Sequence, residues 1–139
     1  MLTEKDYCDY EICVALKELG YKTPTSAYYI PNNETLYFVS NPYRGGYVID
    51  CFHSHNSLRE DVMTHDFIDA PTMWEAQKWL REEKHLHIEI RWFSNMWYEY
   101  EVKEAEGNVL AEGSAFKTYE EALSTAIYMA TEHLKEEKL

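Results

Sequence analysis

The sequence predicts a single α+β domain in two layers, with an N-terminal helix and β-hairpin followed by an α-β-β-β-α unit. Two observations carry this prediction for the second half of the chain. Two T-x-x-E capping boxes each precede an amphipathic helical stripe, and three alternating apolar and polar segments lie between them. At 139 residues the chain has the length of one domain. We expect residues 1–70 to form an α-β-β extension and residues 71–139 to form the α-β-β-β-α unit.

The first helix is expected to start near Thr3, because Thr3 and Asp6 have the spacing of a helix N-cap and its third helical residue. Gly20 follows the apolar stripe and is a suitable left-handed stop. At helical spacing, one face of this segment carries Cys8, Ile12, Ala15, Leu16 and Leu19.

Extended segments should follow this helix. Residues 36–40 and 47–52 are rich in aromatic and β-branched side chains, and NPYRGG between them is typical of a hairpin turn. Residues 57–67 have the spacing of a short helix.

The second half is more regular. Thr72 and Glu75 predict a helix to about Lys84, and Thr118 and Glu121 predict another that carries the chain's longest apolar stripe. Between them, LHIEIRWF, WYEYEV and VLAEGSAF predict three antiparallel strands, with the helices covering one face. In the first strand that covered face should carry Leu86, Ile88, Ile90 and Trp92. The element order is that of double-stranded-RNA-binding domains, but the last helix begins TYEEA rather than with the lysines that those domains use.

Composition excludes several classes of function. The net charge is −12 and evenly spread: residues 1–70 carry 11 acids and 5 bases, and residues 71–139 carry 14 and 8, which gives −6 for each half. Direct nucleic-acid binding is therefore not expected, since it depends on clustered Lys and Arg. No apolar run is long enough for a membrane span, and three cysteines are too few for a disulfide framework. We expect a cytoplasmic protein whose partner is another protein, and the negative charge suits a basic one.

The stretch DCFHSHNSLREDVMTHD is the one candidate metal site, and Zn is the candidate ion. Its candidate ligands are His53, His55, His65 and Asp66. The H-x-H pair followed by Asp66 resembles the zinc motif of JAMM-type isopeptidases, although Met63 and Asn56 stand where that family has serine and proline. The alternative is a solvated polar connection rich in histidine. A second pair, His85 and His87, is expected to lie exposed on the polar side of a strand.

The many tyrosines and tryptophans are expected mainly in the core, as is Cys8. Tyr43, Tyr47 and Trp97 are the candidates for a partner-binding surface. No catalytic motif is assembled: the sequence has no G-x-S-x-G, no Gly-rich phosphate loop and no C-x-x-C.

Three stretches, DYEICVALKELGYKTPTSAYY, APTMWEAQKWLREEKHLHIEI and KTYEEALSTAIYMATEHL, resemble a group of small hypothetical proteins of phages, prophages and mobile elements in Bacteroides-like bacteria. The resemblance implies a bacterial cytoplasmic protein and no particular activity. The expected function is a non-catalytic accessory protein that binds another protein. The alternatives are a metal-binding protein or metal-dependent hydrolase that uses the His-x-His stretch, and an acidic mimic of nucleic acid that inhibits a DNA-binding protein.

Overall fold

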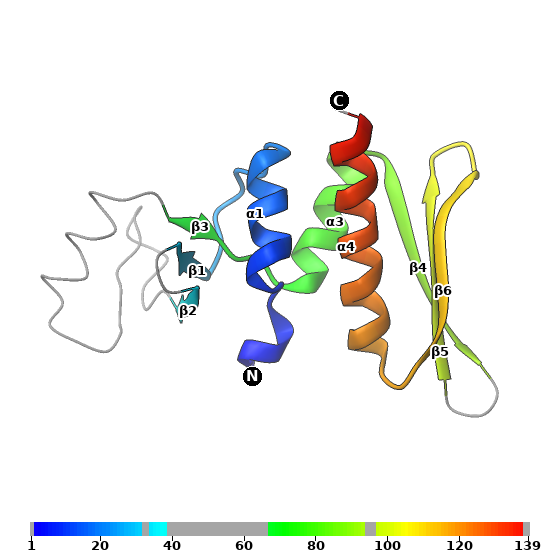
Figure 1. The fold of residues 1–139 in the computed structure, drawn as a ribbon, viewed down its shortest axis with the longest axis horizontal. Coiled ribbons are helices and arrows are strands. Elements are labelled where there is room, and N and C mark those ends of the chain that lie inside the picture. Colours follow the sequence, from blue (N-terminus) through cyan, green and yellow to red (C-terminus); the bar gives the residue numbers. More distant parts are fainter. Residues whose placement is uncertain (1, 32–33, 39–66, 94–96, 138–139) are drawn as a thin grey trace, which may run out of the picture.

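The computed structural model describes residues 2–31, 34–38, 67–93 and 97–137. Within them it confirms the α+β fold, built from three helices and two antiparallel sheets. Figure 1 shows four layers: a small sheet, helix α1, the pair α3 and α4, and a larger sheet. The predicted α-β-β-β-α unit forms the last two of these layers. The N-terminal extension adds the other two.

The larger sheet has the order β4-β5-β6 and consists of Leu86–Phe93, Trp97–Glu104 and Val109–Phe116. Helices α3 (Met73–Glu83) and α4 (Tyr119–Glu137) cover one face of it. The capping box before α3 is complete: the Thr72 hydroxyl accepts from the Glu75 N–H, and the Glu75 carboxylate accepts from the Thr72 N–H. The Thr118 hydroxyl accepts from the Glu121 N–H at the start of α4. Both predicted helix starts are confirmed.

The prediction of one continuous helix from Thr3 was wrong. Thr3 and Asp6 do form a capping box, but it closes only a single 3-10 turn, Glu4–Asp6. The chain then runs extended, because the Cys8 N–H donates to the Pro71 carbonyl, 2.9 Å away, and Tyr7 forms a β-bridge with Thr72. Helix α1 (Tyr10–Glu18) starts afresh with Asp9 as its N-cap and is followed by Gly20 at φ +101°.

The small sheet has the order β2-β1-β3 and consists of Ala27–Ile30, Thr35–Phe38 and Ile68–Asp69, named in chain order. The predicted strand at residues 36–40 is thus found as β2, and β1 is its antiparallel partner. Pairing with residues 47–52, and the short helix predicted at 57–67, fall almost wholly outside the described residues. Strand β3, only two residues long, was not predicted.

One hydrophobic core joins the N-terminal extension to the second unit, because α1 packs against α4. The predicted apolar stripe of the first segment is fully buried, and most of the α4 stripe is as well. The largest completely buried side chains of these layers are those of Tyr28, Ile12, Leu16, Leu80, Leu123 and Ile127. The described parts of the N-terminal extension and of the second unit therefore share one core.

Candidate functional site

Exposed aromatic side chains gather where β4 ends and β5 begins. Trp92, Phe93 and Trp97 are 64%, 41% and 37% exposed, and we call these three residues the hairpin patch. Phe93 lies directly opposite Trp97, and Trp92 lies opposite Tyr98. Trp97 was predicted as a partner-binding residue and lies on this surface. The other two candidates, Tyr43 and Tyr47, lie outside the described residues.

Trp92 was expected in the core, and this prediction was wrong. Helix lengths supply the reason. Eight residues of strand span about 27 Å, whereas the eleven residues of α3 span about 16 Å. Since only two residues join α3 to β4, the helix covers the Leu86 end of the strand and leaves the Trp92 end open. Phe93 was missed altogether. The sequence did contain a signal for it, because Phe93 is an apolar residue on the polar side of the alternation.

The face of the larger sheet that points away from the helices, here called the outer face, carries a regular charge array. Glu89 lies opposite Glu101, and Glu101 lies opposite Glu112, so three carboxylates form a row across the three strands. Arg91 and Lys103 bracket this row. The array ends at the hairpin patch.

Both cations are bonded to more than one carboxylate. The Arg91 Nε lies 3.1 Å from Glu99 Oε1, and an Arg91 terminal nitrogen also contacts Glu101. The Lys103 Nζ lies 3.1 Å from Glu89 Oε2 and 3.8 Å from Glu101 Oε1. Glu101 is the central acid and its side chain is only 12% exposed. The row of carboxylates is therefore neutralised in part by its neighbours, unlike the free phosphates of nucleic acid.

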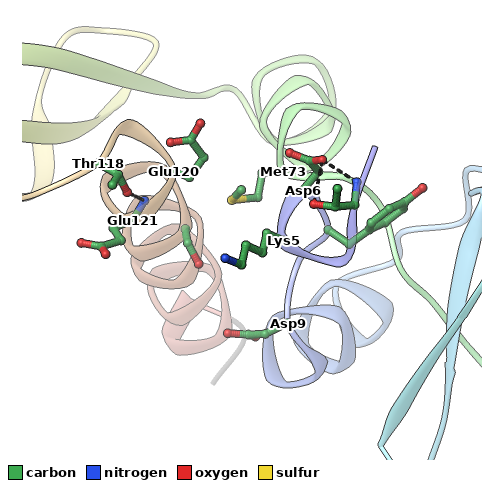
Figure 2. A pocket seen from close by; sticks show the side chains of 10 residues that line it. Lys5, Asp6, Asp9, Met73, Thr118, Glu120 and Glu121 are labelled. Atoms are coloured by element: carbon green, nitrogen blue, oxygen red, sulfur yellow. Dashed lines mark hydrogen bonds between the residues drawn. The ribbon is translucent and has the colours of Figure 1, made fainter. Parts of the chain in front are cut away.

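A cleft of about 610 Å³ opens where α1, α3 and α4 all begin (Figure 2). Lys5 extends into it from the N-terminal turn, towards α4. The cleft is lined by Thr3, Lys5, Asp6, Tyr7, Asp9, Met73, Thr118, Glu120, Glu121 and Ser124. Several of these groups already accept hydrogen bonds from helix-start N–H groups. Asp9 caps α1, Thr118 caps α4, and Asp6 accepts from the Thr3 N–H. These acids and hydroxyls stabilise helix N-termini, and the described residues that line the cleft include no histidine or cysteine.

The two described cysteines are packing residues, as predicted for Cys8. Cys8 and Cys13 are buried within the core between α1 and its neighbours. Burial raises the pKa of both thiols well above the ordinary value, and neighbouring carboxylates such as Asp9 raise it further. The thiolate is the reactive form, so neither side chain is a nucleophile at neutral pH.

The predicted metal site lies outside the described residues, because His53, His55, His65 and Asp66 all fall within residues 39–66. Within the described ranges, no group of three or more His, Cys, Asp or Glu side chains is placed to hold a metal ion. His87 is exposed on β4, as expected for the polar side of a strand, whereas His85 is exposed in the connection before β4. In the same part of the chain, no helix combines the length and apolar character needed to cross a bilayer.

No protein family, curated protein or solved structure matches this sequence.

Proposed function

We propose that this chain is a non-catalytic accessory protein of the bacterial cytoplasm that works by binding another protein. The observation that supports the proposal is the hairpin patch. Phe93 and Trp97 lie opposite each other and stand exposed on one face at the end of the paired hairpin, and Trp92 stands exposed on the other face. Tryptophan and other aromatics contribute most of the binding energy in many protein interfaces. They bury a large area, and they lose little conformational entropy because they have few rotatable bonds.

Charge supports a basic or mixed-charge partner. The net charge of −12 steers positively charged surfaces towards the chain, and the outer face next to the hairpin patch presents a row of carboxylates. Arg91 and Lys103 interrupt that row, so this face gives no specific support to nucleic-acid mimicry. The metal-dependent alternative depends on His53, His55, His65 and Asp66, which lie outside the described residues, so the structure gives it no support.

Capture of partners with matched variants tests the proposal. The bait protein is compared with Phe93→Ala/Trp97→Ala, which removes two aromatics of the patch. The control is Val109→Ala, which truncates an exposed side chain opposite Lys103, at the far end of the same sheet. We expect a partner that binds the unmodified chain and the control but is lost from the double variant. Loss of an anchor of this kind costs about 2 kcal/mol or more. Partners retained equally by all three baits would refute the proposal.

A further inference from the structure

Strand β4 lies at an edge of the larger sheet, and the direction of its backbone groups follows from the neighbouring turn. The Glu104 N–H donates to the Asn108 carbonyl and the Glu104 carbonyl accepts from the Gly107 N–H, so Glu104 faces β6. Backbone groups alternate in direction along a strand, so Lys103, Glu101, Glu99 and Trp97 face β4 instead. Their partners are the odd-numbered residues of β4. The even-numbered residues, Leu86, Ile88, Ile90 and Trp92, therefore direct their N–H and C=O groups out of the sheet.

A side-chain contact agrees with this assignment. The Gln77 amide nitrogen donates to the Ile88 carbonyl oxygen across 3.2 Å. This is the only hydrogen bond from a described side chain to the open edge of β4. It places α3 beside that edge, on the helix-covered side of the sheet. The Ile90 N–H and carbonyl point out of the same edge, and no described side chain is hydrogen-bonded to them.

Apolar side chains flank this edge. Trp74 lies one turn before Gln77 on α3 and is 41% exposed. Trp92 is the most exposed large aromatic described, and Ile88 and Ile90 are half-buried. The other edge of the sheet is different, because β6 has two register shifts and Ala115 at φ +71°. Irregularities of that kind block strand addition, whereas β4 is regular over all eight residues.

We propose that the β4 edge binds an extended segment of a partner protein as a fourth strand, antiparallel to β4 and beside α3. This inference rests on the proposed protein-binding function and names the kind of segment that would bind. Side chains facing α3 should be apolar, to contact Trp74, Ile90 and Trp92. Side chains on the outer face should include an acid opposite Arg91 and a base opposite Glu89.

A second copy of this chain would satisfy the local charge pattern, because antiparallel pairing of two β4 strands about Ile90 also puts Glu89 opposite Arg91. Each copy carries a net charge of −12, so two copies repel each other. An extended segment of a neutral or basic partner meets no such repulsion.

The probe is the blocked peptide TVEVKVT, whose central valine would pair with Ile90 and whose Glu and Lys would face Arg91 and Glu89. Amide resonances of the ¹⁵N-labelled protein are followed during titration. We expect shifts and slowed hydrogen exchange at Ile88, Ile90 and Trp92. The same peptide with its central valine N-methylated lacks the donor for Ile90, and we expect it to bind about tenfold more weakly. Equal binding of both peptides, or shifts confined to other elements, would overturn the inference.

Two variants of the chain sharpen the test. Ile90→Pro removes an outward-facing N–H, which β5 does not use, and should weaken TVEVKVT about tenfold. Gln77→Ala frees the Ile88 carbonyl and should strengthen binding about threefold. If Ile90→Pro does not fold, Gln77→Ala alone tests whether the peptide binds at the β4 edge. Unchanged or weaker peptide binding by Gln77→Ala would count against the inference.

Variants of the hairpin patch distinguish failure of this inference from failure of the proposed function. If the peptide still binds to the Phe93→Ala/Trp97→Ala variant, the β4 edge is a binding site that does not require the hairpin patch. Patch-dependent capture of a partner without any peptide binding would refute the edge and leave the protein-binding function standing. Sedimentation of the free protein as a dimer that Ile90→Pro dissociates would overturn the inference in favour of self-association.

Discussion

Gly113 on β6 faces the ring of Tyr100 on β5 so closely that the position has no room for a side chain. A Cβ atom placed on Gly113 would lie 2.5 Å from Tyr100 Cε2 and 3.1 Å from Cζ. Tyr100 is itself buried, and its ring also contacts Phe116, so it cannot move aside freely. Gly113 therefore lets an aromatic ring lie flat against the sheet next to a register shift.

Gly113→Ala is expected to destabilise the fold by about 1–3 kcal/mol, since the added methyl group overpacks the core. Urea unfolding measures the change. The control is the double variant Tyr100→Leu/Gly113→Ala compared with Tyr100→Leu alone. With the ring removed, the added methyl group should cost less, and a cost equal to that in the parent protein would contradict the explanation.

The capping box before α3 predicts a second stability effect. Thr72→Ala removes the hydroxyl that accepts from the Glu75 N–H at 3.1 Å and leaves that helix-start donor without its partner. The expected cost is about 1–2 kcal/mol in the free energy of unfolding. Thr72→Ser keeps the hydroxyl and should retain most of the stability. Equal losses in the two variants would show that the methyl group matters and the cap does not.

The charge array on the outer face predicts a salt-dependent effect. Arg91→Gln leaves Glu99 and Glu101 without the guanidinium that bonds to both. Arg91 is about half exposed, so the expected loss is modest, about 1 kcal/mol at low salt, and smaller in 1 M NaCl because the remaining repulsion is screened. Arg81→Gln, on the exposed side of α3, is the matched control. A loss that does not change with salt would rule out electrostatic repulsion as its cause.

The buried thiols predict both low reactivity and a stability limit at alkaline pH. Burial raises the pKa of Cys8 and Cys13, so the folded state keeps both thiols protonated where the unfolded chain ionises them, above about pH 8.5. Their contribution to stability is complete below that pH and falls as the pH rises above it. In a Cys51→Ser background, we expect a thiol reagent to modify neither cysteine at neutral pH until urea unfolds the protein. Fast modification of the folded protein would contradict the assignment.

The accuracy of the sequence-based predictions followed the range of the interactions concerned. Helices α3 and α4 were predicted correctly because their caps and stripes are local. Strand β4 was predicted for the same reason. The break at Tyr7 and Cys8 could not be predicted, because the groups that pair with this segment are Pro71 and Thr72, more than sixty positions away.

The candidate site shows the same limit. Alternation correctly gave the direction of Trp92, towards the helices, but it contains no information on how far α3 extends along the strand. The exposure of Trp92 depends on the length of α3 relative to that of β4. The direction of the Ile90 backbone groups likewise follows from the turn after Glu104, because that turn fixes which residues of β5 face β4 and hence which residues of β4 face outward.

Helices α1, α3 and α4 all begin at the cleft and run in the same direction (Figure 1). Parallel neighbours cannot be joined by a short turn, so the polypeptide must travel back along its own length before each next helix starts. The partner of the first helix is therefore the last one, over a hundred residues further along. During synthesis on the ribosome, the part of α1 that packs against α4 must wait for nearly the whole chain to emerge. Folding of this protein is thus expected to be a late, all-at-once event rather than a stepwise one.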